Sequence, residues 1–181
     1  CDADPPSLTD HASVRDGICC DLNNIPLQSK SQDFVTCGMV VEHLSDPQGC
    51  LAELSRVLDD HGELIIHTVN LWGYPTQLAL LAKLIPAGLR RRMVATLTGR
   101  LDEDIFPTHY RCNTDRKITQ LLERAGFNVK VKHLNHGPLF KLLPFYLAEL
   151  LLIRLTSIGL FKRLRGQLLV TATKAVPAKS C

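Results

Sequence analysis

The chain has 181 residues, 45% of them hydrophobic and 22% charged, which is ordinary for one globular domain with a sizeable core. A net charge of +3 is too small to indicate nucleic acid, so no nucleic-acid partner is expected. Seven cysteines are an odd number and form no Cys-x-x-Cys pair. A disulfide framework is therefore not indicated, and we expect a reducing, cytoplasmic compartment.

Short apolar runs at 17–21, 33–38 and 62–70 predict strands of a parallel sheet. They are rich in Val, Ile and Cys, which fits strands buried on both faces. A helix is predicted between the last two runs, with Ser45 or Asp46 as its N-cap and Pro47 in its first turn. This strand-helix-strand crossover is typical of an α/β fold.

The second half of the chain predicts one more helix and two more strands. The helix covers about 114–125 and is ended by Gly126, and the strands cover 127–134 and 167–174. The segments 71–113 and 139–165 belong to none of these strands and helices and are predicted to be helical insertions.

These insertions leave two interpretations open. The first insertion carries the basic patch Arg90-Arg91-Arg92, and the second carries Leu, Ile and Phe around nearly its whole helix. Charged residues interrupt that helix, so a span of about 20 apolar residues, which a bilayer crossing requires, is not expected. The insertions either pack on the domain or make peripheral contact with a membrane.

Polar residues and a glycine follow the predicted strands, at the edge where open parallel sheets bind ligands. Carboxylates there suit hydroxyl groups or an exocyclic amine, as in a nucleoside, and glycine lets a ligand approach the backbone closely. No convincing cluster of metal ligands accompanies them. In chain order these residues are Asp2, Asp21, Gly38, Glu42, His43 and Asn70.

Seven short segments, in this order and spacing, resemble class I S-adenosylmethionine-dependent methyltransferases of the small-molecule type. The segments are DADPPSL (2–8), DLNNIPL (21–27), DFVTC (33–37), VEHL (41–44), LSRVL (54–58), HGELII (61–66) and AGF (125–127). The resemblance implies a Rossmann-like, mostly parallel sheet with flanking helices and an antiparallel last strand. It also implies methyl transfer from S-adenosylmethionine to a small acceptor, and the apolar insertions suggest a lipophilic one.

The resemblance assigns a cofactor site to five positions. Asp2 matches the acid that binds the ribose hydroxyls, and Asp21 the acid that faces the adenine amino group. The Leu22 backbone would lie beside the ring, and Cys37 and Gly38 would flank the methionine part.

Two histidines are candidates for catalysis. His43 would lie near the acceptor, either as a general base or in a packing role beside the cofactor. His109, followed by Tyr110 and Arg111, either folds over the acceptor or anchors a loop.

One feature of the family is missing. No segment matches its first strand or its Gly-x-Gly-x-Gly loop, so we expect 1–181 to be a single methyltransferase domain that is incomplete at its N-terminus. The insertions 71–113 and 139–165 would form a lid over the substrate. The alternatives are a non-catalytic methyltransferase-like binding module, a nucleotide-dependent oxidoreductase, and a peripheral membrane protein whose sheet is only a scaffold.

Overall fold

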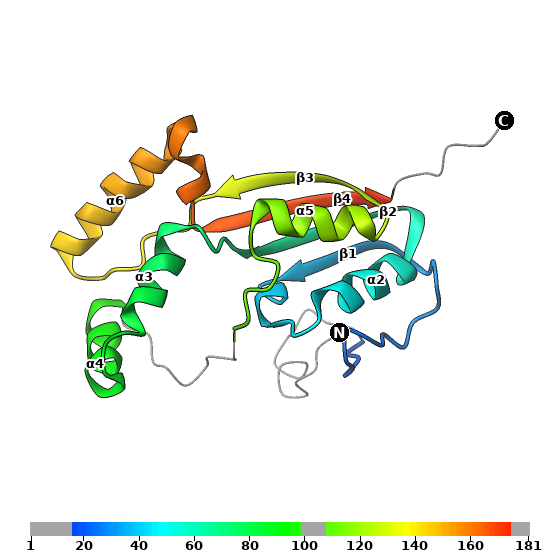
Figure 1. The fold of residues 1–181 in the computed structure, drawn as a ribbon, viewed down its shortest axis with the longest axis horizontal. Helices are drawn as coiled ribbons and strands as arrows, with labels where there is room; N and C mark the ends of the chain where they lie inside the picture. Colours follow the sequence, from blue (N-terminus) through cyan, green and yellow to red (C-terminus); the bar gives the residue numbers. More distant parts are fainter. Residues whose placement is uncertain (1–15, 99–107, 175–181) are drawn as a thin grey trace.

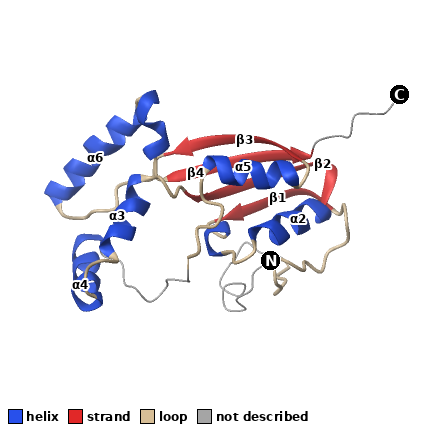
Figure 2. Ribbon diagram, viewed as in Figure 1, coloured by secondary structure: helices blue, strands red, loops and turns tan. Residues whose placement is uncertain are grey.

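A computed structural model describes residues 16–98 and 108–174, so the prediction for Asp2 lies outside the described residues. The described strands form one sheet in the order β1-β2-β4-β3 (Figures 1 and 2). Strand β1 (Gln32–Gly38) is parallel to β2 (Leu58–Val69), whereas β4 (Gln167–Lys174) is antiparallel to both β2 and β3 (Phe127–Leu134). Strands β1, β2 and β3 therefore run one way and β4 the other. The predicted α/β sheet with an antiparallel last strand is confirmed.

Helices α2 (Pro47–Val57) and α5 (Asp115–Arg124) cover one face of the sheet, as Figure 1 shows. Burial alternates along β2 because these helices cover only one face. Leu64, Ile66 and Thr68 are buried, and the residues between them are partly exposed. The core between sheet and helices is completed by Leu51, Leu54, Ile118, Leu122, Leu168 and Val170.

The helix ends follow from local side-chain chemistry. Asp46, not Ser45, caps α2, and its Oδ1 accepts the backbone N–H groups of Gln48 and Gly49 at 3.2 and 3.1 Å. Thr114 caps α5 in the same way. Gly126 follows α5 with a φ of 87°, a left-handed conformation that glycine adopts without a steric penalty.

The predicted strand at 17–21 is wrong. Residues 16–31 fold as turns and irregular chain, with only an isolated β-bridge at Cys19. Cys19 is exposed and Cys20 is half-buried, so neither is a fully packed core residue. The apolar run is only three residues long and is followed at once by the turn that begins at Asp21, which leaves too little length for a ladder of strand pairing.

The segments 71–98 and 139–165 contain further helices and extend from the end of the sheet to which β1 and β3 point (Figure 1). The first forms α3 (Tyr74–Ala82) and α4 (Ala87–Thr98), and the second forms α6 (Leu143–Ser157) and the 3₁₀ helix η3 (Gly159–Leu164). The second insertion breaks at Ile158, whose backbone is extended at φ −68° and ψ 134°. Within 16–98 and 108–174, no helix combines the length and apolar content that a bilayer crossing requires.

Candidate active site

The carboxyl end of β1 is open. Gly38 is the last residue of the strand and is exposed, and a Cβ added to it would have no heavy atom of residues 16–98 or 108–174 within 4 Å. The chain then turns sharply, with Met39 at a φ of 55° and its N–H bonded to the His67 carbonyl at 2.7 Å. Neither a left-handed backbone nor a close neighbour requires glycine at position 38. The open space in front of it is available to a ligand.

A buried chain of three polar side chains lies just beyond this turn. Thr68 Oγ1 donates to Glu42 Oε2 at 2.8 Å and accepts from Asn113 Nδ2 at 2.7 Å. Asn113 Nδ2 also donates to the Val69 carbonyl, and all three side chains are at most 3% exposed. Asn113 Oδ1 is buried without a hydrogen-bond partner among the described residues. This chain joins the short helix η1 (Val41–His43), the end of β2 and the segment before α5.

The segment before α5 packs against η1 through its backbone. The N–H groups of His109 and Tyr110 donate to the Glu42 carbonyl at 2.8 and 3.2 Å. Cys112 Sγ contacts the Val41 carbonyl at 3.7 Å, and Tyr110 has a φ of 52°. The structure thus brings exposed His109 to the same edge as half-buried His43. The catalytic roles of both histidines stay predictions.

Asp21 begins a turn that lies against the first turn of α2. Its Oδ1 accepts the backbone and side-chain N–H groups of Asn23 at 2.9 and 3.0 Å, and the carboxylate is exposed. A Cβ on Gly49 of α2 would lie 2.9 Å from Asn23 Oδ1, which places this turn at the N-terminus of that helix. Asp21 therefore caps a turn, and its predicted cofactor role stays a prediction. Leu22 is half-buried against the core.

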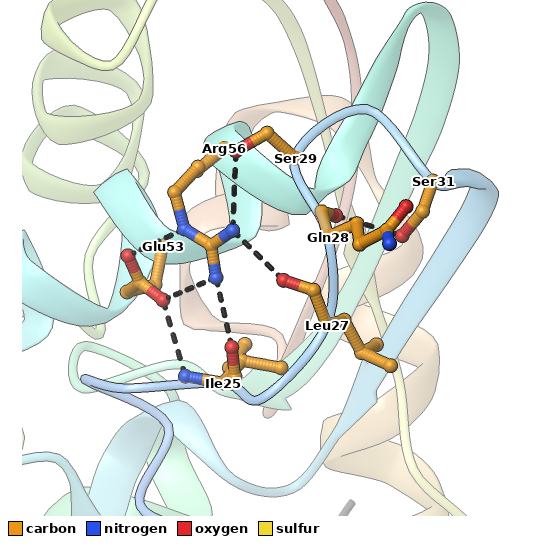
Figure 3. A network of polar contacts seen from close by, with 7 residues as sticks. All are labelled: Ile25, Leu27, Gln28, Ser29, Ser31, Glu53 and Arg56. Carbon is orange, nitrogen blue, oxygen red and sulfur yellow. Dashed lines mark hydrogen bonds and ion pairs between the residues drawn. The ribbon is translucent and has the colours of Figure 1, made fainter.

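The chain after Asp21 is fastened to α2 by an arginine, as Figure 3 shows. Arg56 donates to the carbonyls of Ile25 and Leu27 at 2.8 and 2.9 Å, and forms a two-pronged ion pair with Glu53. Glu53 Oε2 in turn accepts the Ile25 N–H at 3.1 Å. Both partners bond to the backbone of the loop, so this network fixes the path of the chain that follows Asp21.

Three buried thiols lie behind this edge. Burial raises the pKa of Cys37 to about 11. Burial, followed by the nearby charge of Glu42, raises the pKa of Cys112 to about 11. Burial, followed by the neighbouring Cys37, Cys112 and Asp21, raises the pKa of Cys50 to about 12. These thiols are protonated near neutral pH and are poor nucleophiles. The predicted contact of Cys37 with a cofactor stays a prediction.

Asn70 has a structural role. Its Oδ1 accepts the Trp72 N–H at 3.1 Å, and its Nδ2 donates to the carbonyls of Arg163 and Arg165, both at 2.8 Å. This buried side chain caps a turn and joins the two insertions at the base of η3. No group of three or more His, Cys, Asp or Glu side chains within 16–98 and 108–174 is placed to hold a metal ion.

The sheet and its flanking helices have the fold of class I S-adenosylmethionine-dependent methyltransferases, which confirms the fold that the resemblance implies. Residues 1–66, about a third of the chain, match the sequence family described as "Methyltransferase domain". A search among curated proteins finds no match to this sequence.

Solved structures give the same fold. A Thermotoga maritima protein, named a SAM-dependent methyltransferase and possible histamine N-methyltransferase, is 17% identical with a TM-score of 0.57, and the match covers 86% of this chain and 62% of that one. A chain from the structure titled "Complex between the Haloferax volcanii Trm112 methyltransferase activator and the putative methyltransferase" is 12% identical with a TM-score of 0.58, and the match covers 97% of this chain and 70% of that one. The [4+2]-cyclase SpnF is 18% identical with a TM-score of 0.50, and the match covers 88% of this chain and 55% of that one.

At these identities the likeness concerns the fold alone. The chain spans 62% of the length of the Thermotoga maritima protein and 55% of the cyclase. The cyclase also shows that the fold by itself does not fix the reaction. What this site does must therefore be argued from its own residues.

Proposed function

We propose that the protein transfers a methyl group from S-adenosylmethionine to a small acceptor bound at the carboxyl edge of the sheet. The observation that carries the proposal is the open strand end at Gly38, in a chain that also exposes the carboxylate of Asp21 and whose residues 1–66 match a methyltransferase family. In open α/β sheets this edge is where ligands bind.

The residues at this edge fit the cofactor. Asp21 offers an exposed carboxylate for the adenine amino group, and the Leu22 backbone beside it would follow the ring. Gly38 offers the space that a side chain would fill, next to the backbone of Cys37. Asp2 would bind the ribose hydroxyls. When bound, S-adenosylmethionine supplies a methyl group activated by a positively charged sulfur.

The protein's contribution to such a reaction is mainly positioning. Glu42 is held rigidly by Thr68, and the backbone of residues 109–110 is bonded to the Glu42 carbonyl. His43 and His109 are therefore presented by a fixed scaffold beside the proposed acceptor. Either histidine would serve as general base only for an acceptor that must lose a proton.

The two insertions would form the acceptor pocket and its lid. They stand at the carboxyl edge of the sheet and are joined to each other, because Lys141 N donates to the Leu97 carbonyl at 2.7 Å and Tyr74 Oη to Glu149 Oε1 at 3.3 Å. Their many exposed apolar side chains favour a lipophilic acceptor, one that a peripheral contact with a membrane would supply.

The test is calorimetric titration of S-adenosylhomocysteine into the protein and into Gly38→Phe. A Cβ at position 38 meets no heavy atom of the described residues within 4 Å, so circular dichroism and the melting temperature should be unchanged while binding is lost. Gly137→Phe is the matched control, because a Cβ there also meets no described heavy atom within 4 Å, and Gly137 follows β3, at the opposite edge of the sheet from β1. Asp21→Ala should weaken binding as well. Unchanged affinity in Gly38→Phe would refute the placement of the cofactor.

Titration with the unsubstituted protein also separates the alternatives. A nicotinamide dinucleotide that binds more tightly than S-adenosylhomocysteine would favour an oxidoreductase. Binding of S-adenosylhomocysteine without methyl transfer to any compound in a screen of lipophilic and polar acceptors would favour a binding module. Transfer only to polar, soluble compounds would refute the lipophilic acceptor and leave the methyltransferase reaction standing.

A further inference from the structure

The four helices of the insertions expose an unusual amount of apolar surface. We call the surface formed by α3, α4, α6 and η3 the helical face. Every exposed large hydrophobic side chain of the described residues, apart from Phe34 and Met39, lies within 72–93 or 142–164. Apolar patches of this extent on an otherwise folded chain mark contact with a partner or a membrane.

Helix α6 buries polar side chains and exposes apolar ones, the reverse of a helix in a water-soluble domain. Its buried side chains are the polar Glu149 and Thr156. Glu149 Oε2 accepts the N–H groups of Leu139 and Phe140 at 2.6 and 3.1 Å, and Thr156 Oγ1 donates to Asn135 Oδ1 at 3.0 Å. The polar side of α6 is thus satisfied by the protein itself.

The opposite side of α6 carries leucines one helical turn apart. Leu143, Leu147 and Leu151 are 67, 55 and 63% exposed. Residues four apart lie on the same side of a helix, so these three form a continuous apolar stripe that faces away from the protein. Leu160 of η3 is 83% exposed and extends the apolar surface beyond α6. Core packing therefore does not account for this helix.

The charge of the two helical segments is strongly positive. Residues 71–98 and 139–165 contain nine Lys or Arg and one acid, Glu149, which is a net charge of 9 − 1 = +8. The whole chain has +3, so the remaining residues sum to 3 − 8 = −5. The one acid is buried, so these segments expose no carboxylate. The nine basic residues are Lys83, Arg90, Arg91, Arg92, Lys141, Arg154, Lys162, Arg163 and Arg165.

The combination of apolar stripe and positive charge identifies one occupant. We propose that the helical face docks on a bilayer surface containing anionic lipids, with the leucines of α6 and η3 in the interfacial layer and the basic side chains among the headgroups. A second copy of the chain is a poor occupant, because two positively charged faces would repel each other. The helical face adjoins the carboxyl edge, so docking would bring the site to a lipophilic acceptor, a step that rests on the proposed function.

Vesicle flotation tests the docking without the reaction. The protein should float with vesicles of phosphatidylcholine mixed with phosphatidylglycerol, and only weakly with phosphatidylcholine alone, and added salt should reduce the binding. Each basic residue near an anionic surface strengthens binding about fivefold, so Arg92→Gln with Lys162→Gln should weaken it about 25-fold. The matched control is Lys130→Gln with Lys132→Gln on β3, which removes the same charge from exposed positions outside the helical face and should change binding little.

A second pair tests the apolar stripe. Leu147→Gln with Leu151→Gln should reduce vesicle binding more than tenfold and leave the melting temperature unchanged, because both side chains are exposed. Failure to float with anionic vesicles, or equal binding by this variant, would overturn the proposal. So would light scattering that shows a dimer which the leucine substitutions dissociate, because the occupant would then be a second copy.

Titration with S-adenosylhomocysteine on the same samples separates the two proposals. The leucine variant should bind it as the unsubstituted protein does. Flotation without cofactor binding would refute the proposed function and leave the docking standing. Cofactor binding without flotation would do the reverse.

Discussion

The buried chain Glu42–Thr68–Asn113 makes Thr68 the most informative position for a substitution. Thr68→Val keeps the shape of the side chain and removes the hydroxyl that bonds to both neighbours. Glu42 loses a hydrogen bond of 2.8 Å to its carboxylate, which is worth about 1.5–3 kcal/mol. Asn113 Nδ2 loses its bond of 2.7 Å and keeps the one to the Val69 carbonyl, a further loss of about 1 kcal/mol. We expect the free energy of unfolding to fall by about 3–4 kcal/mol.

Urea denaturation, followed by circular dichroism, measures this loss. With a urea dependence of about 2 kcal/mol per molar, the midpoint should fall by about 1.5–2 M while the slope stays the same. Thr68→Ser is the matched control, because it keeps the hydroxyl and loses only a methyl group, at a cost of about 1 kcal/mol. A valine variant as stable as the serine variant would refute the reasoning, since the hydroxyl would then contribute nothing.

Two further predictions concern stability. Cys37, Cys50 and Cys112 have pKa values raised above the ordinary 9.0, so these thiols ionise at lower pH in the unfolded chain than in the folded one. The free energy of unfolding should therefore fall as pH rises above 9, by about 1.4 kcal/mol per pH unit for each thiol. Urea unfolding in reductant at pH 8 and 10 measures this loss of stability. Cys50→Ala should remove about a third of the loss, and an identical pH dependence in that variant would contradict the prediction. Gly126→Ala should lower the free energy of unfolding by about 1–2 kcal/mol, because the backbone of Gly126 is left-handed at a φ of 87°. Gly137→Ala is the control and should have little effect. Equal losses of stability in the two variants would contradict the argument.

The elements that the sequence predicts well are those whose ends carry their own chemistry. Thr114 and Gly126 mark both ends of α5 because each acts on the backbone beside it. Asp46 and Pro47 do the same for the start of α2. The run at 17–21 has no such signal, and composition alone suggested a strand that the turn at Asp21 prevents.

The site is only partly readable from the sequence. The place of Gly38 at the end of β1 could be predicted from a local pattern, whereas Asp21 was placed by a strand that the structure does not contain, and the cofactor roles of both stay predictions. Asn113 was missed, because its partner Thr68 lies 45 residues away and no motif links them. A hydrogen bond between distant residues depends on the completed sheet and leaves no periodic trace.

The second insertion shows the same limit for a helix. Its sequence is apolar all round, so the pattern does not say which side faces the protein. Glu149 reads in the sequence as a charge that interrupts the apolar run, yet it is the residue that α6 buries. Its burial depends on the N–H groups of residues 139–140, which accommodate the carboxylate only in the folded chain.

The way the insertions are fastened to the sheet bears on how such a protein diversifies. Asn70 bonds to the carbonyls of Arg163 and Arg165, and the Arg165 guanidinium bonds to the carbonyls of His133, Thr156 and Ser157. Carbonyls are present whatever the side chain. The exposed positions of η3 and the outer side of α6 can therefore accumulate substitutions while these anchors persist. Selection can reshape the surface that meets new molecules without rebuilding the sheet.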